Sequence, residues 1–139
     1  MTTDLPLVKV VGVSASGKST LVRNLREAGY NARSVSQEHT EVQDLWQRIR
    51  PPAVLIYLDV NLAMQRERRP DVSWDQAHVE VEQRRLAHAR TAAHVTIDTS
   101  SIGAADTLAV ALDFLRSAQI PHAATPLPPA SATGGISHE

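Results

Sequence analysis

The octapeptide GVSASGKS, residues 12–19, constrains the fold of this chain more than any other stretch. It fits the pattern G-x-x-x-x-G-K-[ST] in full. An almost entirely apolar run at residues 7–11 precedes it, and apolar residues at helical spacing follow it over residues 19–28. Glycine permits the backbone angles and the close approach that a bound phosphate requires. The sequence therefore predicts an α/β fold in which a strand passes through a phosphate-binding loop into a helix.

The chemistry of such a loop assigns roles to individual residues. Successive backbone N–H groups turn inward around a phosphate, and the helix that begins near Ser19 directs its N-terminal N–H groups and its dipole at the same anion. Lys18 would reach the β- and γ-phosphates, and the Ser19 hydroxyl would bind Mg²⁺. The expected nucleotide-binding residues of the loop are Gly12, Ser14, Ala15, Ser16, Gly17, Lys18, Ser19 and Thr20.

Composition narrows the classes of function. A length of 139 residues favours one domain, and a net charge of −1 gives no overall bias toward nucleic acid or anionic membranes. The chain has no cysteine, which excludes disulfides and thiolate metal sites and favours an intracellular compartment. It shows no signal-peptide pattern and no apolar run of about 18 residues. We expect a soluble, cytoplasmic monomer or homodimer without a nucleic-acid or membrane partner.

Beyond the loop, strand patterns alternate with helix patterns. Further strands are expected at residues 32–36, 53–58 and 94–98, and further helices at residues 40–49, 61–69, 73–92 and 108–115. Helix starts are marked by Thr40 with Gln43, by Asn61, and by Ser73 with Gln76, which are capping residues or capping boxes. This alternation predicts a parallel sheet with helices on both faces.

The last part of the chain has a different composition. Residues 121–139 are rich in Pro, Ala, Ser and Gly and offer almost nothing to bury. We therefore expect a single domain over residues 1–120 and a disordered tail over residues 121–139.

The loop sequence GVSASGKSTL resembles the first loop of the small P-loop kinases, which include nucleotide, shikimate, gluconate and adenylylsulfate kinases. The segment AVLIYLDVNLAMQRERRP is similar to their late strand, the helix after it and an arginine-bearing lid. HVTIDTSS resembles their last strand and the loop beside the adenine. The resemblance covers roughly residues 5–118 and implies a three-layer P-loop NTPase fold with helices flanking a short parallel sheet.

The resemblance also implies site residues. Lys18 would hold the transferring phosphate, and Arg66 and Arg69 would act as lid arginines that neutralise charge in the transition state. The adenine would be lined by Thr99, Ser100, Ser101 and Ile102. The alternative for the arginines is a solvated helix end, where cations favour the negative end of the helix dipole.

One part of the chain departs from the family pattern. These kinases have five strands and an acceptor-binding segment between the first and the fourth, whereas only one strand fits between residues 12 and 52 here. We predict four strands, with the first strand central and the second beside it.

This departure leaves the catalytic carboxylate open among three alternatives. Glu38 follows the second strand, where it could contact Mg²⁺ or take the proton of the acceptor. Asp59 ends the strand AVLIYLD in the manner of a Walker-B aspartate, although the family comparison gives it a structural place. The third alternative is that neither residue acts. We favour Glu38 as both the catalytic carboxylate and a metal ligand with Ser19.

Five further residues have two interpretations each. His39 could touch the acceptor or lie in a surface turn, and Trp46 and Trp74 could form a substrate platform or pack in the interior. Arg84 and Arg85 could point at the site, or belong to a solvated face that Glu80 and Glu82 balance.

Together these features predict an ATP- and Mg²⁺-dependent phosphotransferase. Its acceptor would be a nucleoside, a nucleotide or a sugar-like alcohol. The alternative is a non-catalytic ATP-binding module that gates a protein partner. A GTPase-like switch is disfavoured because the Asn-Lys-x-Asp element that reads guanine does not occur in the sequence.

Overall fold

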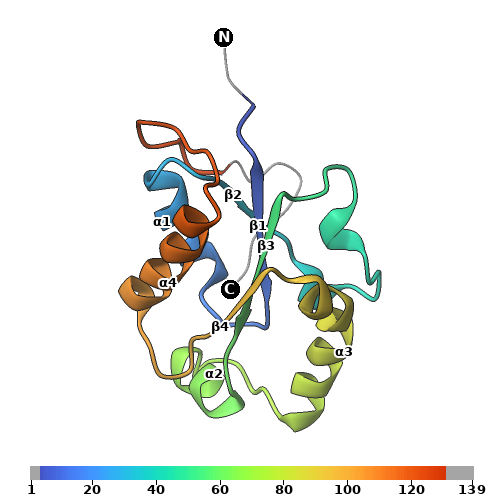
Figure 1. Cartoon of the computed structure of the whole chain (residues 1–139). Coiled ribbons are helices and arrows are strands. Elements are labelled where there is room, and N and C mark those ends of the chain that lie inside the picture. Colours follow the sequence, from blue (N-terminus) through green and yellow to red (C-terminus); the bar gives the residue numbers. More distant parts are fainter. Residues whose placement is uncertain (1–3, 131–139) are drawn as a thin grey trace.

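A four-stranded parallel sheet forms the centre of the computed structural model, which describes residues 4–130 (Figure 1). The order is β2-β1-β3-β4. Strand β1 (Leu7–Gly12) pairs with β2 (Asn31–Ser34) on one side and with β3 (Val54–Asp59) on the other, and β3 pairs with β4 (Val95–Asp98). The predicted four-stranded α/β fold, with the first strand central and the second beside it, is confirmed.

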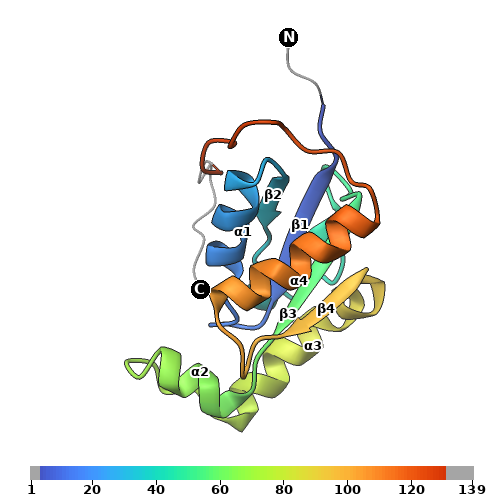
Figure 2. The ribbon, with the colours of Figure 1, turned by 60° about the vertical axis from the view of Figure 1, so that its left-hand side comes forward.

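Helices α1 (Lys18–Glu27) and α4 (Ala104–Ser117) cover one face of the sheet (Figure 2). The side chains of a strand alternate between its two faces, so Val8 and Val10 point to this layer. Two buried polar side chains, Arg26 of α1 and Thr107 of α4, also lie on this side. The apolar core here consists of Val8, Val10, Leu21, Val22, Leu25, Tyr30, Ala32, Val54, Ile56, Leu58, Ile97, Ala111 and Leu115.

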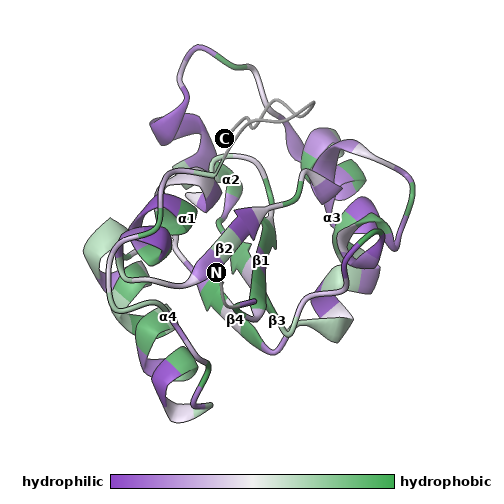
Figure 3. Cartoon of the chain, turned by 90° about the horizontal axis from the view of Figure 1, so that it is seen from above, coloured by the Kyte–Doolittle hydropathy of each residue, from purple (hydrophilic) through white to green (hydrophobic). Residues whose placement is uncertain are grey.

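Helix α3 (Gln76–Ala92) and the segment 36–50 cover the opposite face. Figure 3 shows the hydrophobic strands between α1 and α4 on one side and α3 on the other. The apolar cluster here is smaller and consists of Val11, Val13, Trp46, Leu55, Tyr57, Val60, Leu86 and Ala89. Lys9 is also buried on β1, and its Nζ donates to the carbonyl oxygen of Trp46 at 2.7 Å.

The prediction of a helix at residues 40–49 is wrong. The structure has two short 3-10 turns instead, η1 (Gln37–His39) and η2 (Leu45–Gln47). The side chain of the buried Gln37 binds the backbone in place of a helical ladder: its Nε2 donates to Val42 O at 2.6 Å, and its Oε1 accepts from Trp46 N at 3.0 Å. Trp46 is buried as a core residue, but Ile49 is 100% exposed.

Helix α2 (Leu62–Arg68) starts as predicted, because the Asn61 side chain accepts from the Met64 N–H at 2.8 Å. The start of α3 differs from the prediction. Its N-cap is Asp75 rather than Ser73, and the Asp75 carboxylate accepts from the His78 N–H at 2.9 Å. Both caps fix the path of the chain between β3 and α3.

Residues 121–130, which we expected to be disordered, make backbone contacts with the end of α1 (Figure 2). Ala123 N donates to Gly29 O at 2.8 Å, and Leu127 N donates to Arg26 O at 2.8 Å. Gly29 has a φ of 96°, and a Cβ on it would lie 2.2 Å from Ala123 O. The rest of the predicted tail, residues 131–139, lies outside the described residues.

Within residues 4–130, no helix combines the length and the apolar character needed to cross a membrane.

Candidate functional site

The glycine loop, residues 12–19, connects the centre of the sheet to α1 and has the backbone shape of an anion-binding nest. Ala15 and Gly17 have φ values of 62° and 100°, and left-handed residues among right-handed ones turn neighbouring N–H groups to the same side. Gly12 is required by close packing, because a Cβ there would lie 2.4 Å from Leu58 O and 2.8 Å from Ser16 Oγ. The loop can therefore present backbone donors to an anion.

The start of α1 differs from the starts of α2 and α3. Asn61 and Asp75 cap those two helices, whereas the glycine N-caps of α1 and α4, Gly17 and Gly103, provide no side-chain hydrogen bond. The first N–H groups of a helix have no acceptor within the helix, and the dipole makes this end favourable for negative charge. Helix α1 is therefore suited to receive an acceptor from outside the chain.

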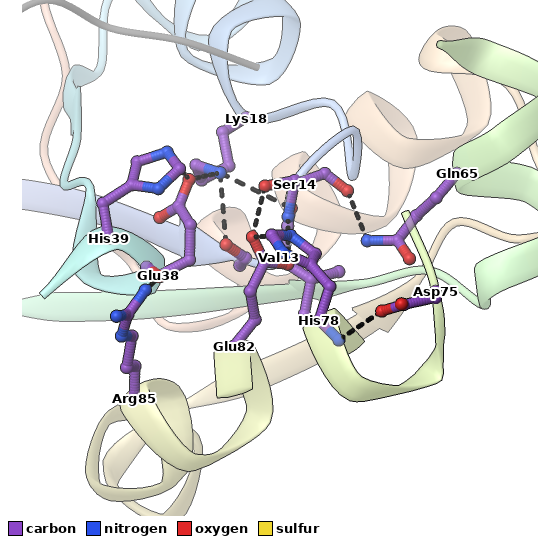
Figure 4. A network of polar contacts seen from close by, with 11 residues as sticks. Val13, Ser14, Lys18, Glu38, His39, Gln65, Asp75, His78, Glu82 and Arg85 are labelled. Atoms are coloured by element: carbon purple, nitrogen blue, oxygen red, sulfur yellow. Dashed lines mark hydrogen bonds and ion pairs between the residues drawn. The ribbon is translucent and has the colours of Figure 1, made fainter. Parts of the chain in front are cut away.

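Lys18 and Glu38 form a completely buried ion pair beside the loop (Figure 4). Lys18 Nζ donates to Glu38 Oε2 at 2.6 Å and to the loop carbonyl oxygen of Gly12 at 3.1 Å. His39 Nε2 lies 3.5 Å from the same carboxylate oxygen, and its side chain is half exposed. In Figure 4, the second oxygen of Glu38 points away from Lys18. The structure thus brings together Lys18 and Glu38, two residues that were selected separately from the sequence.

The buried polar atoms that lack a hydrogen-bond partner in residues 4–130 concentrate at this site. They are Ser16 Oγ, Glu38 Oε1, Gln65 Oε1 and His78 Nε2. His78 Nε2 lies in ion-pair range of Glu82 Oε2, at 3.1 Å. Most buried polar atoms in proteins are paired, so each of these atoms is a place where a water molecule, an ion or a ligand group can bind.

Ser14 is held by side chains of two other helices, a feature that the sequence analysis missed. Its N–H donates to Glu82 Oε1 at 3.1 Å, its hydroxyl donates to Glu82 Oε2, and its carbonyl oxygen accepts from Gln65 Nε2 at 2.9 Å. Glu82 and Gln65 are both buried. Glu82 thus does not belong to a solvated face. The signal was available, because Glu82 stands at helical spacing from the buried Leu86 and Ala89.

A cavity of about 340 Å³ lies beside the glycine loop. Of the expected adenine-lining residues, Thr99 and Ile102 line it, but Ser100 and Ser101 do not. Ser100 Oγ instead accepts from the Asn61 N–H at 2.9 Å. The other lining residues are Ala15, Ser16, Gly17, Thr20, Leu21, Arg68, Arg69, Gly103, Ala104 and Thr107.

The arginines of α2 are arranged differently from the prediction. Arg68, which was not selected, donates to Ala15 O at 2.7 Å and to Thr99 Oγ1 at 3.1 Å, so it ties the loop to the end of β4. Arg69 lines the cavity and pairs with Asp71 at 2.9 Å. The exposed Arg66 donates to Trp74 O at 2.9 Å and is absent from the lining of the cavity. Of the two arginines selected from the sequence, Arg69 therefore lies at the cavity and Arg66 does not.

The other carboxylate alternative, Asp59, has local partners. It accepts from the Val60 N–H at 2.9 Å and lies 3.8 Å from Arg90 Nη2 on α3. These contacts stabilise the end of β3, as the structural interpretation requires. The ion pair of Asp59 with Arg90 is partly exposed, whereas the pair of Glu38 with Lys18 is buried.

The remaining candidates lie on the α3 side. Arg84 and Arg85 bind Glu41 at 2.9 and 2.7 Å, and Arg85 also donates to the Glu38 carbonyl oxygen at 3.3 Å. The hydrogen bonds from Arg84 and Arg85 lower the pKa of the Glu41 carboxyl. Trp74 is buried and stacks on His78. Arg84 and Arg85 thus anchor the segment 36–50 to α3, and Arg85 does so in part through the backbone of Glu38, which belongs to that segment.

The side-chain oxygens of this site suffice to bind Mg²⁺ only together with the phosphates of a nucleotide. No group of three or more His, Asp or Glu side chains that could hold a metal occurs in residues 4–130. Mg²⁺ commonly takes one or two protein oxygens, phosphate oxygens and water. The Ser19 hydroxyl and the unpartnered Glu38 Oε1 are oxygen donors of this kind.

Comparison with protein-family models and with curated proteins found no match to this chain. The case for its function therefore depends on the geometry of the site.

Proposed function

We propose that this chain is a P-loop kinase-like phosphotransferase that uses ATP and Mg²⁺ to phosphorylate a hydroxyl group of a small molecule. One observation carries the proposal. Lys18 Nζ lies at the glycine loop between a loop carbonyl and the buried carboxylate of Glu38, whose second oxygen has no partner. A phosphoryl-transfer site needs a cation for the phosphate and a carboxylate beside it, and both are present.

Binding would use two adjoining parts of the site. The N–H groups of the loop and of the first turn of α1, together with Lys18, would hold the phosphates. The base would enter the cavity that Thr99, Ile102 and Arg69 help to line. Such a nucleotide-dependent enzyme fits the absence of cysteine and a cytoplasmic location.

Ser19 and Glu38 would hold Mg²⁺, which supplies neutralisation of the charge on the β- and γ-phosphates when it is bound. These two residues would fix the ion beside Lys18. They would leave its remaining positions to phosphate oxygens and water.

In the transfer step, the hydroxyl oxygen of the acceptor attacks the γ-phosphorus as the bond to the β–γ bridging oxygen breaks. The hydroxyl proton would pass to Glu38 Oε1, which would contact Mg²⁺ only through water, and the electron pair of the broken bond stays on ADP. Lys18 and Arg69 would neutralise the charge of the transferring group. The products are ADP and a phosphorylated acceptor.

A second function, the non-catalytic nucleotide-binding module, has one observation in its favour. Glu38 Oε2 is already bound to Lys18 at 2.6 Å, so one of the two oxygens of this carboxylate is engaged within the chain. In such a module, nucleotide binding would order the α2 region and control a partner, with no transfer to an acceptor.

The proposal is tested by following ADP release from Mg-ATP in the presence of nucleosides, nucleoside monophosphates, sugars and sugar acids. We expect acceptor-dependent release that Lys18→Ala and Glu38→Gln abolish. Arg23→Ala, which removes an exposed cation from the same helix, should change nothing. Tight ATP binding without acceptor-dependent release would favour the regulatory module. Unaltered ATP affinity in Lys18→Ala would contradict the assignment of the loop.

A further inference from the structure

The contacts of Ser14 suggest how the glycine loop obtains its shape. We propose that Glu82 and Gln65 are positioning residues that impose the phosphate-binding conformation on the loop through Ser14. This inference rests on the proposed nucleotide binding at that loop. It assigns a role in binding to two helix residues, Gln65 of α2 and Glu82 of α3, that would not contact the phosphates themselves.

All three hydrogen-bonding groups of Ser14 are taken by these helices. Glu82 accepts from its N–H and its hydroxyl, and Gln65 donates to its carbonyl oxygen. The Ser14 N–H therefore faces α3, which corrects the expectation that Ser14 contributes to phosphate binding. The Ser16 N–H donates to Val13 O at 3.2 Å. The phosphates would be left to the other N–H groups that follow Ser14 in the loop and in the first turn of α1.

Packing alone does not explain Glu82. The residue is completely buried in line with Leu86 and Ala89, where an apolar side chain would fill the space without the cost of burying a carboxylate. The carboxylate contacts of Glu82 in the described part of the chain are Ser14 and His78, which lies 3.1 Å from Oε2. A buried carboxylate whose two oxygens both bind one loop residue serves to hold that residue.

The residue after Ser14 shows why the loop needs holding. Ala15 adopts a φ of 62°, a left-handed conformation that is unfavourable for a residue with a Cβ. Such conformations persist where the surroundings fix them from both sides. Glu82 and Gln65 fix Ser14 before this position, and Arg68 binds the carbonyl oxygen of Ala15 itself. The strained turn that shapes the nest is thus held from α2 and α3.

This arrangement separates two parts of nucleotide recognition. The phosphates need the shape of the loop, whereas the base occupies the cavity beyond it. A loop that loses its anchor should bind triphosphate more weakly and bind adenosine as before. A general loss of structure would weaken both.

The test compares ATP affinity by titration calorimetry and adenosine affinity by NMR titration in full-length variants. Glu82→Leu fills the space but cannot bind Ser14, and we expect it to weaken ATP binding about tenfold, in line with the loss of hydrogen bonds to a charged group. Adenosine affinity should stay within about twofold of the wild type. Glu82→Gln retains an acceptor for the Ser14 N–H and a donor for its hydroxyl oxygen, so it should recover most of the ATP affinity.

Two further variants keep the test decisive if Glu82→Leu does not fold. Ser14→Ala removes only the hydroxyl contact and should weaken ATP binding by a few-fold, without a further loss when combined with Glu82→Gln. Glu80→Gln removes an exposed carboxylate from the same helix and should have no effect.

Unchanged ATP affinity in both Glu82→Leu and Ser14→Ala would overturn the inference and leave the proposed function standing. An equal loss of ATP and adenosine affinity would also overturn it. Absence of ATP binding by the wild-type chain would overturn the proposed function together with this inference.

Discussion

The two faces of the sheet are covered in different ways. Helices α1 and α4 pack on one face through aliphatic side chains such as Leu25 and Leu115. On the other face, α3 and the segment 36–50 are held in large part by buried polar groups, among them Lys9, Gln37 and Glu82. The proposed site lies at the end of the strands, where the polar face meets the glycine loop (Figure 4).

This difference separates stability from function. Apolar packing is non-directional and tolerates changes in shape, whereas a buried polar group requires a partner of defined geometry. The face with more buried polar groups, which costs more free energy to assemble, is the face that positions Glu38 against Lys18. The comparison therefore predicts that substitutions on the apolar face reduce stability alone, and that those on the polar face alter local structure near the site.

The largest effect is expected on the apolar face. Leu115 is completely buried in α4, and Leu115→Ala should lower the free energy of unfolding by about 3 kcal/mol through lost burial and the cavity left behind. Urea denaturation measures this value. ATP affinity, measured where the variant is folded, should not change. A large fall in affinity at that condition would break the proposed separation of the two faces.

A smaller effect is expected from Lys9→Met on the polar face. The variant leaves the Trp46 and Arg48 carbonyl oxygens without their donor, so the free energy of unfolding should fall by about 1–2 kcal/mol. The tryptophan fluorescence of the folded variant should also report a change around Trp46. An unchanged emission spectrum and unchanged stability would contradict the role of Lys9 in holding η2.

Lys9 also predicts a dependence on pH. Burial, and then the charge of Arg50, lower the pKa of Lys9 below its ordinary value of 10.5. The unfolded chain therefore binds more protons between the lowered and the ordinary pKa, so the contribution of Lys9 to the free energy of unfolding rises with pH in that interval. Burial raises the pKa of Tyr57, which acts in the opposite direction at high pH. Both proteins contain Tyr57, so its contribution drops out when the free energy of unfolding of Lys9→Met is subtracted from that of the wild type at each pH.

The smallest effect concerns the exposed contact between Glu41 and α3. Hydrogen bonds from Arg84 and Arg85 lower the pKa of Glu41, so its stabilising contribution is present above its ordinary pKa and is lost as pH falls through the lowered value. An NMR titration of Glu41 should show the lowered pKa, and Arg84→Gln should raise it toward the ordinary value. A Glu41 pKa that is the same in both proteins would contradict the contact.

The comparison of the faces also explains which predictions succeeded. The strands, α1, α2 and α4 follow from apolar periodicity and capping residues, because their cores are apolar and local signals agree with the packing. The segment 40–49 has the same helical spacing, but Lys9 and Gln37 bind its backbone carbonyl and N–H groups from elsewhere. Polar contacts that a segment makes with residues outside it produce no periodic pattern in the sequence.

The same reason limits the prediction of the site. The motif locates the loop and Lys18, because these depend on spacing within one stretch of chain. Glu38 is one of three alternatives for the carboxylate, favoured by its place after the second strand. Arg68 lay beside the two selected arginines of α2 but could not be separated from them, because the direction of a side chain depends on where the helix docks. Glu82 lies 68 positions after Ser14, and only the fold brings them together.

The central position of β1 affects folding during synthesis, because the strands emerge from the ribosome in the order of the sequence. Val8 pairs with Ala32 on one side and with Val54 on the other, so the first strand to emerge must wait for the third before both of its edges are paired. The anchor for Ser14 leaves the ribosome later still, because Glu82 lies in α3. During synthesis the nascent chain therefore carries the complete glycine-loop motif well before it carries the residues that give the loop its shape, and nucleotide binding should appear only after α3 has emerged.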